Sequence, residues 1–112
     1  MLQGKTAIVT GSSRGIGETT VIQLAKNGAN VIAHARKKTD EFESKCKNIE
    51  NKYGVWIQPV YFDAADSIQM KEAVKKIKCK SEGKVDILVN NMGVAQSIKL
   101  FQMTKMEKNE RR

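Results

Sequence analysis

The sequence predicts an α/β fold, in which a parallel sheet is covered by helices on both faces, within one domain of 112 residues. Short runs rich in β-branched residues alternate with segments of helical period, and the connections between them are short. A glycine-rich turn joins the first such run to the first helical segment. Strands that alternate with single amphipathic helices pair in parallel through right-handed crossovers. The length excludes two complete domains.

The first half of the chain is predicted to form two strands and two helices. Residues 6–10, Thr-Ala-Ile-Val-Thr, show no polar alternation, which is typical of a strand covered on both faces. Residues 15–27 change to a helical period, and residues 30–35 form a second short strand. A second amphipathic helix begins at Asp40 and ends at Gly54.

The second half adds two strands and one helix. Residues 55–62 form the third strand, and Pro59 within it predicts a sheet edge because proline cannot donate to a ladder. Asp66 caps a third helix, and residues 84–90 form the fourth strand. The inward positions of that helix are Met70, Ala73, Val74, Ile77 and Ser81. A doubly wound sheet with strand order 3-2-1-4 puts the third strand at the edge, in agreement with Pro59. One further helix is predicted to begin at Thr104.

The chain is basic, with 20 Lys and Arg residues against 12 Asp and Glu and a net charge of +8. Most of the excess is lysine on predicted helix surfaces, so a solvated basic face accounts for it. Nucleic acid is not favoured as a partner because no aromatic residues are interleaved with the lysines. A non-catalytic nucleotide or nucleic-acid binding module that uses this basic helical face is the alternative function.

The cysteines and the N-terminus indicate the compartment. Cys46 and Cys79 lie in predicted helices, and neither has a partner at the spacing of a metal site. The chain begins without an apolar signal segment, and no run approaches the ~18 apolar residues of a membrane span. We expect a cytoplasmic protein with reduced thiols, no metal and no membrane contact.

The most informative segment is Thr-Gly-Ser-Ser-Arg-Gly-Ile-Gly at residues 10–17, between the first strand and the first helix. In this context each glycine has a physical role. Gly11 permits a tight exit from the strand, Gly15 lets backbone N–H groups approach a pyrophosphate, and Gly17 allows close packing of the helix. The helix N-terminus supplies unpaired donors and partial positive charge. The turn therefore predicts a site for the phosphates of a dinucleotide.

This turn resembles the nucleotide-binding motif of the short-chain dehydrogenases/reductases, a Rossmann-fold family. Asn-Asn-Met-Gly at residues 90–93 resembles that family's Asn-Asn-Ala-Gly, with Met92 where alanine is usual, and Asp63 looks like the aspartate that contacts adenine. The matches occur in the family's order and cover the chain to about Thr104. Within the family the chain looks most like the 3-oxoacyl-(acyl-carrier-protein) reductases and related hydroxysteroid-type dehydrogenases. The resemblance implies a single, incomplete NAD(P)-binding Rossmann domain over residues 1–112.

The resemblance also implies which residues contact the cofactor. Around the pyrophosphate and phosphates it puts Gly11, Ser13, Arg14, Gly15, Ile16 and Gly17; at the adenine, Asp63 and Ala64; and beneath the ribose and nicotinamide, Asn90, Asn91, Met92 and Gly93. A structural role for Asn90, tying neighbouring strands through its amide, is an equal alternative. Met92 puts a long flexible side chain where the family has a methyl group.

The charge at the end of the second strand favours NADP(H) over NAD(H). An acidic residue there would bind both ribose hydroxyls and repel a 2′-phosphate. This chain has Ala35 instead, followed by Arg36 and two lysines. Arg36 and Arg14 together offer two guanidinium groups that can flank a 2′-phosphate. The single histidine, His34, is interpreted as a strand residue near the adenine rather than an acid/base catalyst.

Residues for the family's catalysis are missing. The family uses a tyrosine, a lysine four residues later and an upstream serine, because a cation beside a phenol favours the phenolate. Here Ile57 follows Tyr53 at that spacing, and Ala65 follows Tyr61. We expect a truncated NADP(H)-binding portion of an oxidoreductase that is inactive alone, its catalytic residues lying beyond Arg112. Its fourth strand, an exposed apolar edge, is predicted to self-associate.

Overall fold

The computed structural model describes residues 1–13, 15–63 and 65–91. The elements in chain order are β1 (Thr6–Val9), α1 (Gly15–Lys26), β2 (Asn30–Ala35), α2 (Asp40–Tyr53), β3 (Ile57–Tyr61), α3 (Ser67–Ser81) and β4 (Ile87–Val89). The helix predicted to begin at Thr104 lies outside the described residues. No helix within the described ranges is both long and apolar enough to cross a membrane.

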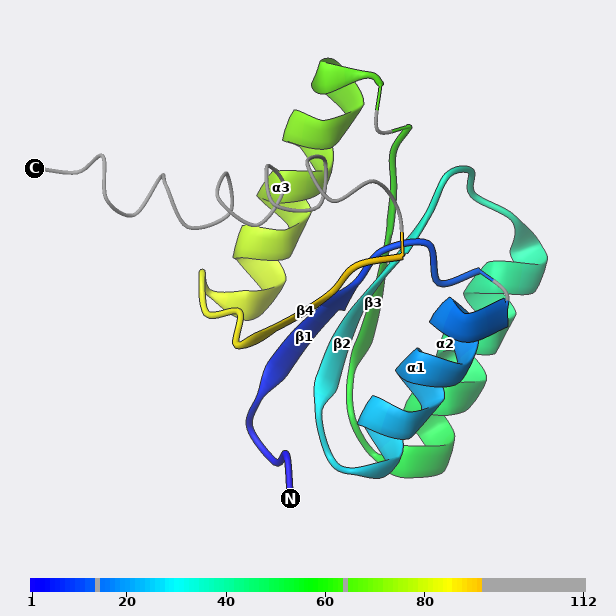
Figure 1. Ribbon diagram of the computed structural model, residues 1–112, viewed down its shortest axis with the longest axis vertical. Coiled ribbons are helices and arrows are strands. Elements are labelled where there is room, and N and C mark those ends of the chain that lie inside the picture. The colour runs from blue at the N-terminus through cyan, green and yellow to red at the C-terminus, as the bar shows by residue number, and fades with distance from the viewer. Residues whose placement is uncertain (14, 64, 92–112) are drawn as a thin grey trace, which may run out of the picture.

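The four strands form one parallel sheet in the order β3-β2-β1-β4, which confirms the predicted order. Helices α1 and α2 cover one face of this sheet and α3 covers the other, so the fold has three layers (Figure 1). The carboxyl ends of all four strands therefore meet at one edge of the sheet. In open parallel sheets this is the edge at which ligands bind.

Two apolar clusters hold the layers together, one on each face of the sheet. Ile8 and Ile32 pack toward α3 with Phe62, whereas their neighbours Val9 and Val31 pack toward α1 and α2. All five side chains are fully buried. Successive strand residues point to opposite faces, so a sheet covered on both sides needs apolar residues in unbroken runs.

The helix boundaries follow from capping. Thr39 precedes α2 and its hydroxyl accepts a hydrogen bond from the N–H of Phe42 at 3.1 Å. The carboxylate of Asp66 accepts bonds from the N–H groups of Ile68 and Gln69 at 3.0 and 3.1 Å, which confirms it as the cap of α3. The five residues predicted to face inward from α3 are all buried.

The third and fourth strands are shorter than predicted, and side chains take part in the hydrogen bonding at the start of each. The N–H of Ile57, the first residue of β3, donates to a carboxylate oxygen of Glu50 at 2.9 Å, and Ile57 is paired with Val31 of β2. Asp86 makes two hydrogen bonds to Thr6. Its N–H donates to the Thr6 carbonyl at 2.8 Å, and its carboxylate accepts from the Thr6 N–H at 3.0 Å. Val85 is buried in the core, so the apolar edge predicted over residues 85–90 is reduced to the half-buried β4.

Candidate functional site

The glycine turn lies between β1 and α1, and its backbone explains two of its three glycines directly. Gly11 and Gly15 have φ angles of 63° and 64°, in the left-handed region that favours glycine. A Cβ on Gly15 would meet nothing within 4 Å, so the backbone there is open to a ligand. A Cβ on Gly17 would lie 2.0 Å from the carbonyl oxygen of Gly11. The third glycine thus lets the first turn of α1 rest against the glycine turn itself.

The end of β2 anchors this turn. The N–H and the hydroxyl of Ser12 both donate to the backbone carbonyl of His34, at 2.8 and 3.0 Å, and the same hydroxyl lies 3.0 Å from the carbonyl oxygen of Val9. The N–H of Gly11 donates to Nδ1 of the His34 ring at 3.0 Å. The N–H groups of Gly11 and Ser12 are therefore hydrogen-bonded to β2, and an anion at the turn would bind to the N–H groups from Ser13 onward.

The end of β4 closes the other side of the turn. The N–H of Asn91 donates to the hydroxyl of Thr10 at 2.9 Å, and the hydroxyl lies 3.4 Å from the carbonyl oxygen of Val89. A Cβ on Gly11 would lie 2.9 Å from the carbonyl oxygen of Asn91, so the two segments are in close contact. Asn90 is exposed beside them. The structure thus brings the two predicted motifs together, and the hydroxyl of Thr10, a residue with no predicted site role, joins them.

Two further predicted site residues meet at the ends of β2 and β3. The guanidinium of Arg36 lies 3.1 Å from Oδ2 of Asp63 in an exposed ion pair. The carboxylate of Asp63 also accepts a hydrogen bond from the N–H of Ala65, which is the main reason that its pKa is lowered, with Arg36 contributing less. Asp63 is therefore ionised and partly offsets the charge of Arg36.

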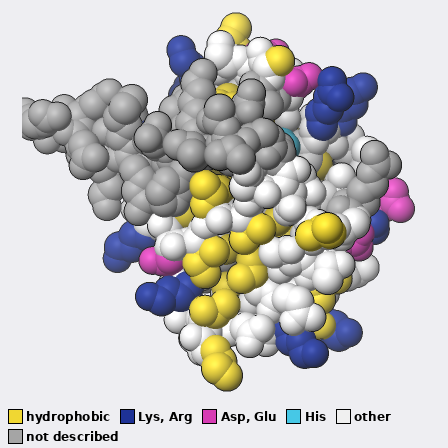
Figure 2. Space-filling model, in the orientation of Figure 1, with side chains coloured by type: hydrophobic (Ala, Val, Ile, Leu, Met, Phe, Trp, Pro, Cys, Tyr) yellow, Lys and Arg dark blue, Asp and Glu magenta, His cyan; other side chains and the backbone are white. Residues whose placement is uncertain are grey.

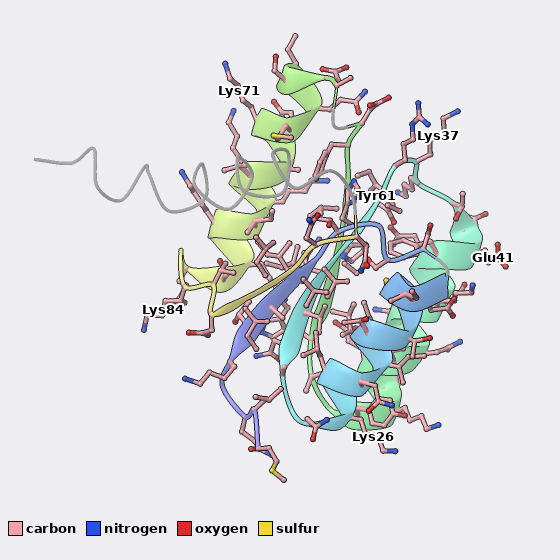
Figure 3. All side chains as sticks on the ribbon, viewed as in Figure 1. Lys26, Lys37, Glu41, Tyr61, Lys71 and Lys84 are labelled. Carbon is pink, nitrogen blue, oxygen red and sulfur yellow. The ribbon has the colours of Figure 1, made fainter. Side chains whose placement is uncertain are left out.

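A hollow beside the turn is lined by three cations, Arg36, Lys37 and Lys45. Its walls come from the turn, the end of β2 and the start of α2, and its lining residues are Ser13, Ala35, Arg36, Lys37, Thr39, Glu41, Phe42 and Lys45. Figure 3 shows Lys37 and Glu41 on the side of the molecule that holds α2, and a cluster of basic side chains lies in the corresponding part of Figure 2. Lys45, which sequence reasoning missed, is 3.5 Å from Oε1 of Glu18 on α1. In the sequence, the position of Lys45 on the inner face of α2 could have indicated that it lines this hollow.

The structure describes only two of the remaining predicted site residues. Ser13 is exposed at the turn, and Ile16 on the first turn of α1 is 78% exposed. Arg14, Ala64, Met92 and Gly93 lie outside the described residues.

The described residues offer no acid/base pair of the family's kind. The hydroxyl of Tyr61 donates to the carboxylate of Glu43, and burial together with this bond raises the pKa of the phenol. The phenolate is thereby disfavoured, which is opposite to what a tyrosine beside a lysine would show. Burial likewise raises the pKa of the Cys46 thiol to about 12. No group of three or more His, Cys, Asp or Glu side chains within these ranges is arranged to hold a metal ion.

Comparison with known proteins gives a consistent result. The model of the short chain dehydrogenase family matches residues 5–111. A 7alpha-hydroxysteroid dehydrogenase from Paraclostridium sordellii is 42% identical over 97 residues, which are 85% of this chain and 34% of that protein. A 3-oxoacyl-(acyl-carrier-protein) reductase from Thermotoga maritima is 36% identical over 102 residues, which are 91% of this chain and 40% of that protein. The matched region thus spans less than half of either relative.

Among solved structures, the fold is similar to that of L-sorbose reductase from Gluconobacter frateurii, determined in complex with NADPH and L-sorbose. The TM-score is 0.79 at 26% sequence identity, and the match covers 95% of this chain and 48% of that chain.

Proposed function

Because the chain belongs to the short-chain dehydrogenase family, we propose that it binds NADP(H) in preference to NAD(H) and forms the cofactor-binding part of an oxidoreductase. The 3-oxoacyl-(acyl-carrier-protein) reductases, represented above by the relative from Thermotoga maritima, are the model for the whole protein. The bound nicotinamide would supply or accept the hydride. The residues of this chain bind and orient the dinucleotide.

The observation that carries the proposal is the charge of the hollow at the end of β2. Ala35 is buried there, so no carboxylate occupies the position from which an acidic residue would repel a 2′-phosphate. Arg36 and Lys37 follow it as exposed cations, and Lys45 faces them from α2. Besides Glu41 in the lining, Asp63 pairs with Arg36 and Glu18 pairs with Lys45. A dianionic phosphate can compete with these exposed carboxylates for the three cations, which a neutral hydroxyl cannot do.

The glycine turn supports binding of the dinucleotide itself, with its pyrophosphate at the start of α1. A Cβ on Gly15 would meet nothing within 4 Å, and the N–H groups at the start of a helix have no partner within the helix, so an anion could bind here. Asp63 lies at the end of β3, where the carboxylate can accept a hydrogen bond from an adenine amino group.

The test is to titrate NADPH and NADH separately by fluorescence at physiological salt. NADPH is expected to bind more tightly, and equal affinities would refute the role of the 2′-phosphate. Arg36→Gln should weaken NADPH binding roughly tenfold, as expected for one exposed charge-assisted hydrogen bond, and leave NADH binding within about twofold. Lys26→Gln is the control, because Lys26 lies at the opposite end of the molecule from Lys37 (Figure 3).

The same proposal includes the absence of turnover by this chain alone. Neither tyrosine is followed by a lysine four residues later, so the proton donor of the family has no counterpart in the sequence. NADPH oxidation with carbonyl substrates should not exceed the rate without protein. Turnover that depends on protein concentration would contradict this.

We also propose self-association through β4, which ends the sheet among the described residues and is half-buried. An unpaired parallel edge of Ile87, Leu88 and Val89 is a template for another strand. Sedimentation should show dimers or larger species, which Leu88→Lys converts to monomer. A monomer at high concentration in the unchanged chain would contradict the proposal.

A further inference from the structure

His34 is buried where three strands end, and both of its ring nitrogens are engaged. The side chain is 5% exposed, and its ring stacks on that of Phe62 with centroids 4.0 Å apart. Nδ1 lies 3.0 Å from the backbone nitrogen of Gly11, and Nε2 lies 2.9 Å from the carbonyl oxygen of Phe62. The ring therefore spans from the glycine turn after β1 to the end of β3.

These two contacts determine the state of the ring. A backbone N–H can only donate, so Nδ1 must carry a lone pair; a carbonyl can only accept, so Nε2 must carry the proton. Only the neutral Nε2–H tautomer satisfies both bonds. In an imidazolium ion Nδ1 also carries a proton, which would point at the N–H of Gly11. The contact with Gly11 would then break, while Nε2–H could still donate to the Phe62 carbonyl.

We propose that His34 is a positioning residue for the cofactor: in its neutral Nε2–H form it fixes the glycine turn relative to the segment that begins at Asp63, and protonation releases the turn. The inference rests on the proposed cofactor site. It goes beyond it by assigning the alignment of the two halves of that site to a buried side chain that acts through its contacts with Gly11 and Phe62.

The backbone of residue 34 strengthens the argument. Its carbonyl accepts from both the N–H and the hydroxyl of Ser12, so residue 34 holds two successive turn residues by three hydrogen bonds. On the other side, Phe62 immediately precedes Asp63, whose own N–H donates to the side chain of Gln69 at 2.8 Å. A movement of the ring is therefore passed to the turn and to the start of the Asp63 segment.

Few charges surround this ring. From β2 the nearest charged residue along the chain is Arg36, from β3 it is Asp63, and these two pair with each other. From α3, Asp66 is engaged in capping, and the residues packed around Phe62 are apolar. The described ends of β1 and β4 near the turn bring only uncharged residues. Burial is accordingly the main effect on the ring and lowers the pKa of His34, while the bond to the Phe62 carbonyl partly opposes the shift.

Two substitutions of His34 each remove one of the two ring contacts and keep the other. Asparagine places its amide oxygen near the position of Nδ1, so His34→Asn keeps an acceptor for Gly11 and cannot be protonated. Glutamine places its amide nitrogen near the position of Nε2, so His34→Gln keeps the donor to Phe62 and loses the acceptor. If His34 only filled space, both variants would bind cofactor equally. If it positions the turn, both variants should bind more weakly than the unchanged chain, and His34→Gln about tenfold more weakly than His34→Asn, as loss of an acceptor for a buried N–H implies.

The first measurement does not need the cofactor. His34 is the only histidine, so the ¹⁵N chemical shifts of a single imidazole report its tautomer and its pKa. The Nε2–H tautomer, a pKa below 6.5, and a Gly11 amide resonance that shifts with that same pKa are expected. The Nδ1–H tautomer, or a Gly11 amide that does not respond to the titration, would overturn the proposal.

The second measurement is calorimetric titration with NADP⁺ at pH values on both sides of the pKa that the ¹⁵N shifts of His34 give. Below the pKa of His34 the affinity of the unchanged chain should fall by up to about tenfold per pH unit. The ratio of its affinity to that of His34→Asn cancels the titration of the ligand's own phosphate. A constant ratio would overturn the proposal. Absence of NADP⁺ binding at pH 8 would refute the proposed function instead, and the resonances of His34 and Gly11 would still decide the role of the ring.

Discussion

Gly17→Ala should destabilise the chain by an amount that can be worked out from local distances. The added methyl would lie 2.0 Å from the carbonyl oxygen of Gly11 and 2.8 Å from the Cα of Ser12. Atoms of this kind do not approach within 3.0 Å, so helix and turn must move apart by at least 1 Å. The obstacle is backbone rather than the end of a flexible side chain.

The turn has little freedom to move away. Ser12 is held by its bonds to the carbonyls of Val9 and His34, and Gly11 by its bond to the ring of His34. Overpacking in a site that cannot relax costs up to about 3 kcal/mol. Alanine recovers about 1 kcal/mol over glycine through helix propensity. The free energy of unfolding should therefore fall by about 2 kcal/mol, which is roughly a thirtyfold change in the ratio of folded to unfolded chain.

Urea unfolding followed through Trp56 measures this change. Trp56 is the only tryptophan and is half-buried against the apolar cluster between the sheet and α3, so its emission reports global unfolding. Ser44→Ala, at an exposed position of α2, is the control and should leave the midpoint unchanged or slightly higher. A Gly17→Ala variant as stable as the unchanged chain would show that α1 does not rest on the turn as described.

Three further outcomes are expected. Gly15→Ala and Gly54→Ala should each lose about 1–2 kcal/mol in urea unfolding because both glycines have positive φ and open space, but only Gly15→Ala should also weaken NADPH binding in the fluorescence titration. Asp66→Ala should lower the stability by about 1 kcal/mol through loss of the α3 cap, and an unchanged urea midpoint would argue against that cap. Stability should decline as pH rises above about 9, because the raised pKa values of Cys46 and Tyr61 keep both groups neutral in the folded chain while the unfolded chain ionises. Cys46→Val combined with Tyr61→Phe should flatten this alkaline decline in urea midpoints measured from pH 8 to 11.

Local patterns predicted the order of the elements and several of their ends. The unbroken apolar runs of β1 and β2 required a sheet covered on both faces, and Pro59 required an edge; both features are present. The turn motif likewise predicted the strand-turn-helix junction. β3 and β4 are shorter than predicted, and at their starts the side chains of Glu50 and Asp86 accept hydrogen bonds from backbone N–H groups. Propensity carries no information on such contacts.

The sequence alone determined the fold class, the strand order and the family resemblance, because these depend on the period of apolar residues and on glycines whose backbone angles other residues rarely adopt. Only the tertiary structure decided how the site is held. Gly11 and His34 are 23 positions apart, Arg36 and Asp63 are 27 apart, and Asn91 meets Thr10 across 81. These pairs form because the carboxyl ends of the parallel strands are brought to one edge, and no local pattern encodes which side chains then fall within hydrogen-bonding distance.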